Sequence, residues 1–556
     1  MLFLALLSIS VSTAQVKMTK KKSKETKAVA PQNVPMSQIN DYSGYYPYVE
    51  YGKFDNGKMW TFSYPPVQYF KETYGFTPSE EWLENMRMSA LRFSTYCTAS
   101  FVSEDGLVMT NHHCGRQSVT EVTKDGEDLP KDGFYAATLE EERKVPGLFV
   151  DQLIAMKDVT SDILMAMSNG KDDDEKNKLK NEKINELVKE NETATGIKVQ
   201  VHTFYNGSIY QMYTYKRYSD VRLVMAPETD LGYFGGDPDN FTYPRYSLDY
   251  TFFRVYDEDG KPLKTKYHYT WSESGAKENE PLFVVGNPGT TQRLSTVSML
   301  EYYRDYTMPH TLDLLNMLGS TYKEYIDSHP ESKLELTDTY FGYMNSLKAY
   351  NGMHGGLKNP DLMGKRASFE KAFKTAVLEK PELKAKYGDI WAKINASRNQ
   401  MKQYFGKQIM FSPSGSTSKL FALGARAIDI ATEMKKPENE RTQGNSDEQL
   451  KAKIEKLKLS KSYYPQIEEK AIEFQLTKIS KWSGNKMRMI DGTNNPVMIP
   501  AQAKAIVANS VVANHEKLMA LFNEGPDAVL NSNDPVLAYC KMSKDSLAYY
   551  KTIIDP

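Results

Sequence analysis

The spacing of apolar positions divides the chain into two parts near residue 295. Before that point, short apolar runs alternate with turn residues, a pattern typical of an antiparallel β-barrel or β-sandwich. A helix start is also predicted at Ser79, where a capping hydroxyl precedes two acidic residues. The predicted strands occupy residues 60–64, 198–204, 209–216, 221–225, 250–256 and 282–286.

After residue 295 the pattern becomes helical. Long charged segments carry apolar residues at helical spacing, and glycine and proline become rare inside them. We therefore expect a second, helical domain that ends near residue 525, with no repeat of fixed period. Its predicted helical segments are 297–355, 366–405, 417–435, 446–482 and 500–525, and residues 160–195 of the first part share their character.

The amino terminus has the features of an export signal. Residues 2–11 are apolar but too few to span a bilayer, and Ser12 and Ala14 suit a signal-peptidase site. We expect a signal peptide over 1–14 and a basic, flexible tether over 15–43, with a buried amino-terminal strand as the alternative. No later segment has transmembrane character, so we expect a periplasmic or secreted bacterial product.

Overall composition is that of an ordinary folded protein, with 40% hydrophobic and 25% charged residues. Lys and Arg number 70 against 71 Asp and Glu, so charge gives no reason to expect a nucleic-acid partner. In an exported chain, Cys97 and Cys114 can close a small disulfide loop. Cys540 is left as a free thiol, or as one whose partner lies outside this chain.

Two histidines follow a predicted hairpin. Residues 100–103 and 107–110 flank an acidic turn with glycine, and the hairpin would bring Cys97 back toward Cys114. A disulfide there would hold the neighbouring His113 rigidly, as a general base requires. The alternatives are strand-end histidines without chemistry, or a zinc site formed by the two histidines and two cysteines. Adjacent strand residues point to opposite faces, so His112 and His113 would converge poorly on one ion.

An aspartate begins the aromatic run at 250–256. A carboxylate buried there needs partners, and an imidazole N–H would be one, so we expect Asp249 to face His113 rather than His112. Asp249 could instead cap a loop or pair with a nearby arginine. The arginines are Arg245 and Arg254, and the competing carboxylates are Asp237 and Asp239, which are weaker candidates because they lie in the preceding loop.

The order of histidine and aspartate, with a disulfide beside the histidine, is that of chymotrypsin-like peptidases. In detail the chain resembles the bacterial dipeptidyl-peptidase 7 and dipeptidyl-peptidase 11 family from about residue 44 to its end. The matching stretches are Trp60 with residues 74–76, then 100–114, 234–256, 286–293, 345–348 and 533–537.

The resemblance implies a chymotrypsin-like double β-barrel with an inserted α-helical domain that caps the cleft. The barrel region would cover 44–294, the helical domain 295–525, and 526–556 would begin an incomplete second-barrel segment. Such enzymes remove dipeptides from peptides with free amino termini, and we expect no cofactor and no metal. Residues 96–99 depart from the family pattern, so substrate preference is not carried over. A homodimer is one assembly that we consider.

The resemblance also assigns site residues. His113 matches the general base and Asp249 the aspartate that orients it. Asn240 matches a residue that holds the substrate's α-amino group, because an ammonium offers only donors and a side-chain carbonyl accepts them. Phe241 stands where the best-known members have tryptophan, and Asn345 matches a second amine ligand. The alternative for both asparagines is an ordinary place in a turn or on a helix surface.

The family's nucleophile lies in a Gly-Asn-Ser-Gly-Ser-Pro turn that this sequence does not contain. Ser446 follows Gly-Asn but precedes two acidic residues, which would oppose an oxyanion, and Ser416 reads as a helix cap. We therefore expect the serine beyond Pro556 and expect this chain alone to be inactive. A non-catalytic peptide-binding protein is the second hypothesis, and a zinc hydrolase using His112 and His113 is the third.

Overall fold

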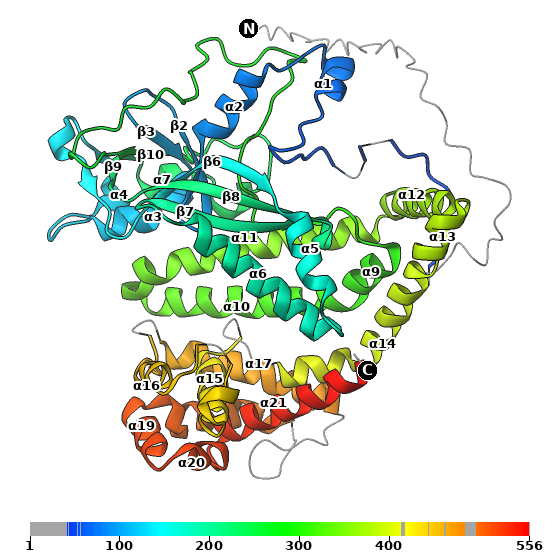
Figure 1. The fold of residues 1–556 in the computed structure, drawn as a ribbon. Helices are drawn as coiled ribbons and strands as arrows, with labels where there is room; N and C mark the ends of the chain where they lie inside the picture. Colours follow the sequence, from blue (N-terminus) through cyan, green and yellow to red (C-terminus); the bar gives the residue numbers. More distant parts are fainter. Residues whose placement is uncertain are drawn as a thin grey trace, which may run out of the picture.

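A computed structural model describes residues 42–554, except 43, 53, 56, 413–416, 443, 461–462 and 484–495. The predicted signal peptide and nearly all of the predicted tether lie outside the described residues. In Figure 1 the strands gather in one sheet, and the helices after residue 295 form layers beneath it. Helices α10 and α11 lie between the sheet and the group that contains α15, α16, α17, α19, α20 and α21, whereas α12 and α13 lie to one side.

One antiparallel sheet of ten strands organises the described part before residue 295. Its order is β4-β9-β10-β3-β2-β1-β6-β8-β7, and β5 also pairs with β9. The strands are β1 Ala90–Phe93, β2 Cys97–Phe101, β3 Leu107–Thr110, β4 Phe134–Tyr135, β5 Arg143–Lys144, β6 Val150–Asp158, β7 Ile197–Phe204, β8 Ile209–Tyr218, β9 Val221–Ala226 and β10 Thr251–Val255.

Two pairings of this sheet position the site. β2 and β3 form the predicted hairpin, with Phe101 opposite Val108 and a left-handed Gly106 (φ +68°) in the turn. β3 also pairs with β10, with Thr110 opposite Thr251. Because the pairing is antiparallel, the segment that follows β3 and the segment that precedes β10 meet at the same end of the sheet.

Four of the predicted strands are present as β7 to β10, but two are not strands. Residues 60–64 and 282–286 have no ladder partner among the described residues. Leu282 is 73% exposed and Val284 is fully exposed. An apolar run becomes a strand only where a neighbouring strand accepts its hydrogen bonds. The sequence prediction also missed β6, one of the longest strands of the sheet.

Short helices accompany the sheet. The predicted helix start is confirmed, since the hydroxyl of Ser79 accepts the N–H of Trp82 at 3.0 Å. The helical character predicted for residues 160–195 is confirmed, and the structure divides the segment into two helices. The helices of this part are α1 Val67–Tyr74, α2 Glu80–Ser89, α3 His112–Glu121, α4 Leu129–Asp132, α5 Thr160–Ser168, α6 Asp173–Asn191, α7 Thr229–Gly232 and α8 Gly236–Asp239, with 3-10 turns η2 Leu139–Glu141 and η3 Tyr205–Gly207.

The second part is helical, as predicted. Its helices are α9 Val297–Tyr302, α10 Met308–Ser328, α11 Lys333–Lys358, α12 Pro360–Leu378, α13 Pro381–Tyr387, α14 Ile390–Phe411, α15 Lys419–Met434, α16 Asp447–Glu455, α17 Pro465–Ser483, α18 Ile499–Asn509, α19 His515–Asn523, α20 Pro526–Leu530 and α21 Pro535–Ile554. Short turns lie at η4 Tyr303–Thr307 (a π-helix), η5 Pro330–Ser332, η6 Glu438–Glu440, η7 Pro496–Met498 and η8 Val511–Ala513.

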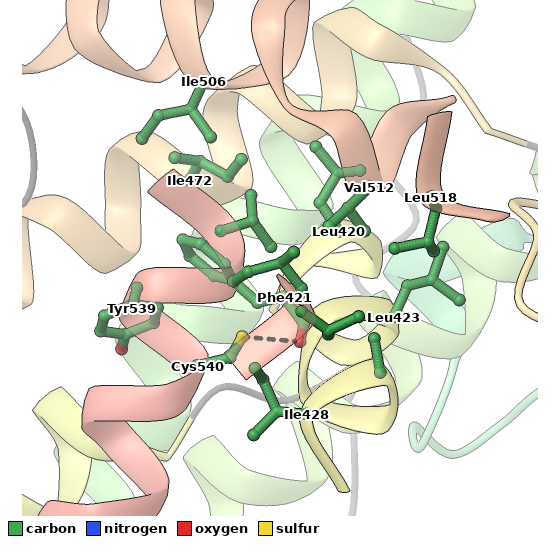
Figure 2. Close-up of a cluster of buried hydrophobic side chains, with 14 of the residues drawn as sticks. Leu420, Phe421, Leu423, Ile428, Ile472, Ile506, Val512, Leu518, Tyr539 and Cys540 are labelled. Carbon is green, nitrogen blue, oxygen red and sulfur yellow. Dashed lines mark hydrogen bonds between the residues drawn. The ribbon is translucent and has the colours of Figure 1, made fainter. Parts of the chain in front are cut away.

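The prediction that 526–556 begins a second-barrel segment differs from the structure, where α20 and α21 belong to the helical part. Val536, Leu537 and Cys540 lie on one face of α21 and are buried in the same apolar core as Phe421 of α15 (Figure 2). Cys540 is a free thiol whose Sγ lies 3.4 Å from the carbonyl oxygen of Phe421, and burial raises the pKa of Cys540 to about 12. The helical part therefore extends past residue 525.

Among the described residues, no helix combines the length and the apolar character that crossing a bilayer requires.

Candidate active site

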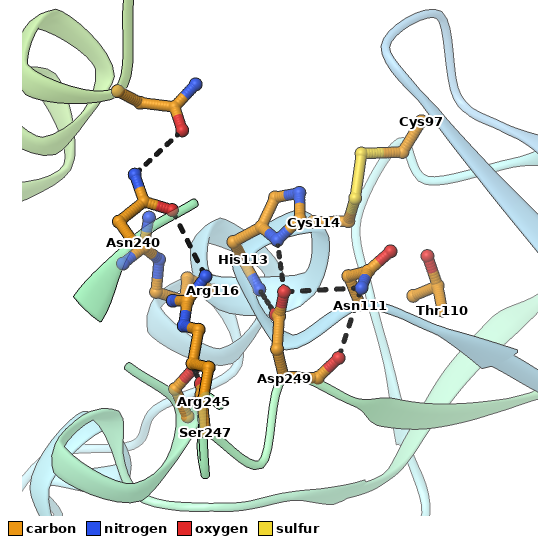
Figure 3. Close-up of polar contacts among 12 residues, drawn as sticks. Cys97, Thr110, Asn111, His113, Cys114, Arg116, Asn240, Arg245, Ser247 and Asp249 are labelled. Atoms are coloured by element: carbon orange, nitrogen blue, oxygen red, sulfur yellow. Dashed lines mark hydrogen bonds and ion pairs between the residues drawn. A yellow bond between two sulfur atoms is a disulfide. The ribbon is translucent and has the colours of Figure 1, made fainter. Parts of the chain in front are cut away.

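His113 and Asp249 meet where β3 leads into α3 and the chain enters β10 (Figure 3). The Nδ1 atom of His113 lies 2.8 Å from Oδ2 of Asp249. The backbone N–H of the same histidine donates to Oδ1 at 3.0 Å. The contact predicted between the two side chains is thus present, while their catalytic roles remain a prediction.

The carboxylate of Asp249 also accepts a hydrogen bond from Asn111, the N-cap residue of α3, whose Nδ2 lies 3.2 Å from Oδ2. Asp249 therefore sits at the amino-terminal end of a helix, where a negative charge is favoured. Burial, the largest single influence, works against the charged form. The hydrogen bonds from His113 outweigh it, and the pKa of Asp249 lies below its ordinary value.

The imidazole of His113 is held on one side and open on the other. Its side chain is 52% exposed, against 26% for Asp249. When Nδ1 donates to the carboxylate, Nε2 becomes the acceptor and faces away from the pair. This is the geometry of a general base that could take a proton from a group arriving from solvent.

The predicted disulfide between Cys97 and Cys114 is confirmed, with the two Cα atoms 6.2 Å apart. It joins the start of β2 to the first turn of α3, next to His113. The histidines do not end a strand, as one alternative supposed. The chain turns into helix after Asn111, so His112 and His113 occupy the first helical turn.

His112 faces the protein interior. It is buried, and its ring packs so closely on Gly232 that a Cβ at that position would collide with it. Burial and then the positive charge of Arg116 lower the pKa of His112 below its ordinary value. The ligand atoms of Cys97, His113 and Cys114 lie within 4.8 Å of one another, but the two sulfurs are bonded to each other and offer no thiolate. The geometry does not favour the zinc hypothesis.

Neither of the two nearby arginines pairs with Asp249. Arg254 pairs with Glu142 at 2.9 Å, and Arg245 donates to Oδ1 of Asn240 at 3.1 Å. The loop carboxylate of Asp237 lies 4.0 Å from the ammonium of Lys348. Within the described part of the chain, the ring of His113 hydrogen-bonds to Asp249 alone among the carboxylates.

The two predicted amine ligands lie together, although they are 105 positions apart in the sequence. Nδ2 of Asn240, after α8, donates to Oδ1 of Asn345, on α11, at 3.0 Å. Asn240 is 6% exposed, whereas Asn345 is exposed. Each amide oxygen keeps a second lone pair for a further donor. Phe241, the residue after Asn240, is 65% exposed and has a positive φ of 60°.

Sequence reasoning missed Asn111 and Lys348. The ammonium of Lys348 donates to the carbonyl oxygens of Asp237, Pro238 and Asn240, which anchors the turn that carries Asn240. The position of Lys348, three residues after Asn345 in a predicted helix, was an available signal. Asn111 was readable as a helix cap if the histidines had been assigned to a helix.

Of the two serines weighed as nucleophiles, Ser446 does not lie in this site. It is the N-cap of α16 in a capping box with Gln449, and α16 is remote from the sheet (Figure 1). Ser416 falls outside the described residues.

Comparison with known proteins places these features in context. The family model described as peptidase S46 matches residues 54–552. Dipeptidyl-peptidase 7 of Capnocytophaga gingivalis is 29% identical over 400 residues, which cover 68% of this chain and 54% of that protein. The Asp/Glu-specific dipeptidyl-peptidase of Shewanella putrefaciens is 27% identical over 476 residues, covering 82% of this chain and 63% of the relative.

Among solved structures, Porphyromonas endodontalis DPP11 in complex with the dipeptide Arg-Asp matches with a TM-score of 0.64 at 22% identity. The match covers 84% of this chain and 70% of that one, and at this identity it supports the fold alone. The chain spans about half the length of the first curated relatives it matches, 54% and 46%.

Proposed function

The chain belongs to the peptidase S46 family, and on that premise we propose that it carries the histidine, aspartate and amine-binding parts of an exported serine dipeptidyl peptidase. The observation that carries the proposal is the His113–Asp249 pair at 2.8 Å, with half of the histidine side chain exposed to solvent. The relatives named as dipeptidyl-peptidases supply the reaction class.

In the proposed mechanism, Nε2 of His113 takes the proton of a serine hydroxyl as that oxygen attacks the carbonyl carbon of the second residue of a peptide. Asp249 holds the Nδ1 proton and stabilises the imidazolium that forms. The imidazolium then gives its proton to the leaving amine. We place the serine in the family's Gly-Asn-Ser-Gly-Ser-Pro turn, on a segment outside this sequence.

Restriction to dipeptides would come from the substrate's amino terminus. A free α-ammonium can donate to Oδ1 of Asn240 and Oδ1 of Asn345, whereas an acetylated terminus has lost the charge and most of its donors. A peptide anchored at the two asparagines would present a bond near its start to Nε2 of His113. Phe241 would border this pocket.

The exposed segment after β10 supports the second barrel of the proposed fold. Trp271, Leu282, Val284 and Leu294 are all more than half exposed. Exposed strand-like apolar runs are expected to pair with further strands, which a second barrel would supply. We propose that the double barrel is completed in this way, and that the protein acts in the periplasm or outside the cell, as a monomer or homodimer.

The test measures release of dipeptide from short peptides with free and with acetylated amino termini. A protein extended through the serine turn is expected to cleave only the free form, and His113→Ala to abolish cleavage. His329→Ala, a histidine on the helical part, serves as the matched control. Turnover that survives His113→Ala would overturn the assignment of the base.

A second candidate is a peptide-binding protein without turnover. The assembled asparagine pair favours it, because binding a free amino terminus needs no nucleophile. It predicts that the 556-residue chain binds free-amine peptides and that the extended protein, with the serine turn present, still releases no dipeptide.

A further inference from the structure

Arg116 stands three residues after His113 on α3 and lies in a contact that the proposed chemistry does not use. Its guanidinium carbon lies 5.4 Å from the ring centroid of Phe341 and 6.0 Å from that of Tyr233. Those two rings contact each other with centroids 4.3 Å apart. Nε of Arg116 lies 3.1 Å from Oδ1 of Asp338.

The side chain of Arg116 is largely buried in this contact. Its side chain is 15% exposed, and within the described residues its Nε and Nη1 atoms are buried without a hydrogen-bond partner. The ion pair with Asp338 therefore lacks hydrogen-bond geometry, and the cation–π contacts and the charge hold the group in place. A buried guanidinium with N–H groups that lack hydrogen-bond partners destabilises the fold, so a structural or functional reason for its presence is expected.

Helix α11 contacts both α3 and the loop that carries Asn240, and it does so through residues on one of its faces. We name Asp338, Phe341, Asn345 and Lys348 the α11 contact face. Their spacings of three, four and three residues place them on one side of the helix. The first two contact Arg116, and the last two contact Asn240 and its turn. One helix face thus touches both the helix that carries His113 and the loop that carries the amine ligand.

We propose that Arg116 is a positioning residue that holds α3 against the α11 contact face and so fixes the distance between the imidazole of His113 and the amide of Asn345. In the proposed function, that distance decides how much peptide fits between the anchored amino group and the bond attacked. Arg116 acts through its neighbours and touches no reacting atom. This inference rests on the proposed function for its consequence, but its structural part stands alone.

The experiment compares Arg116→Met with Arg222→Met in the 556-residue chain. Arg222 is a matched control, because it also pairs with a carboxylate (Asp220, 3.0 Å) and covers a ring (Tyr256, 3.6 Å). It lies near the start of β9, opposite Arg254 of β10 and away from the site. Hydrogen exchange measured by mass spectrometry shows directly whether Arg116 holds α3 against the α11 contact face. Exchange in the first turn of α3 and in residues 233–245 is expected to rise about fivefold in Arg116→Met and to stay unchanged in those segments of Arg222→Met.

Binding of tetra-alanine, with its amino terminus free or acetylated, reports the consequence. The preference of the wild-type chain for the free form is expected to fall about fivefold in Arg116→Met, while affinity for the acetylated form stays the same. A purely structural loss would weaken both peptides together. Equal hydrogen exchange of the first turn of α3 and of residues 233–245 in the two arginine variants would overturn the proposal. Equal binding of both peptides by the wild type would overturn the proposed function instead, and the exchange result would still decide the role of Arg116.

Variants on the partner helix guard against misfolding of Arg116→Met. Asp338→Asn is expected to raise exchange in the same segments by a smaller factor, because this carboxylate is 53% exposed. Phe341→Leu removes the ring contact and is expected to have the larger effect of the two. If neither variant changes hydrogen exchange in α3, the contacts of Arg116 do not hold α3 against the α11 contact face.

Discussion

Replacing Asp249 with Asn tests the site's central contact, because the carboxylate accepts from three donors at once. These are the backbone N–H and Nδ1 of His113, at 3.0 and 2.8 Å, and Nδ2 of Asn111, at 3.2 Å. An amide of the same shape turns one acceptor into a donor, so at least one N–H loses its partner. Loss of a helix-capping acceptor costs about 1 kcal/mol, and loss of one charge-assisted bond costs about 1.5–3 kcal/mol.

Partial exposure reduces that sum. The side chains of His113 and Asp249 are 52% and 26% exposed, so water replaces part of what is lost. The two losses together amount to about 2.5–4 kcal/mol, and with this reduction we expect Asp249→Asn to lower the local stability of α3 by about 2 kcal/mol at pH 7.

The pH dependence follows from the lowered pKa of Asp249. A carboxyl group whose pKa is lower in the folded than in the unfolded state stabilises the fold above the unfolded value, near 3.8, and this contribution is lost as the pH falls through the folded pKa. The stability difference between wild type and Asp249→Asn is therefore expected to be complete at pH 7 and to shrink below about pH 4.

Hydrogen exchange at neutral pH and urea unfolding at pH 7 and pH 3.5 measure the two effects. Asp105→Asn is the control, since Asp105 pairs with Lys264 on the exposed hairpin turn and little change is expected there. If the amides of α3 exchange equally in wild type and Asp249→Asn at pH 7, the carboxylate does not hold the helix. A difference that persists undiminished at pH 3.5 would refute its electrostatic origin.

Three further predictions address the surroundings. Mutating Cys97 and Cys114 together to Ala removes a crosslink with a sequence separation of 17 and is expected to cost up to about 3 kcal/mol in urea unfolding; the double variant, unlike wild type, should not respond to a reductant. Gly232→Ala would collide with the buried imidazole beneath it and is expected to cost about 1–3 kcal/mol by thermal unfolding, whereas Gly289→Ala, with open space around it, should be neutral. Burial lowers the pKa of His202 from 6.5 to about 4, so the neutral ring stabilises the fold above pH 6.5 and this contribution is lost as the pH falls toward 4. Between pH 7 and pH 5, the free energy of unfolding of His202→Gln is therefore expected to fall by about 1–2 kcal/mol less than that of wild type. An identical fall in both proteins would contradict this.

The sequence predicted the elements whose partners it also contains. The hairpin around Gly106 and the strands β7 to β10 combine alternating apolar positions with nearby strands that pair with them. The contact of His113 with Asp249 was predictable because a carboxylate at the start of an apolar strand needs a donor. The helical part was predictable from its period.

What the sequence could not predict depends on neighbours that a pattern does not reveal. The run at 282–286 has a strand's composition, yet no described strand pairs with it. Residues after 525 were assigned to a barrel from the resemblance, while the apolar face of α21 buries Val536 and Cys540 among helices. Likewise, two adjacent histidines do not indicate the start of a helix unless Asn111 is recognised as the N-cap residue.

The α11 contact face has a consequence for how the gene can change in length. Each residue added to an α-helix turns everything beyond it by about 100°. A single insertion between Phe341 and Asn345 would leave Phe341 in contact with Arg116 but swing Asn345 and Lys348 away from the loop. A seven-residue insertion would restore their direction but shift them about 10 Å along the axis. This short span should therefore resist both insertion and deletion, while the loops at either end of α11 can vary in length.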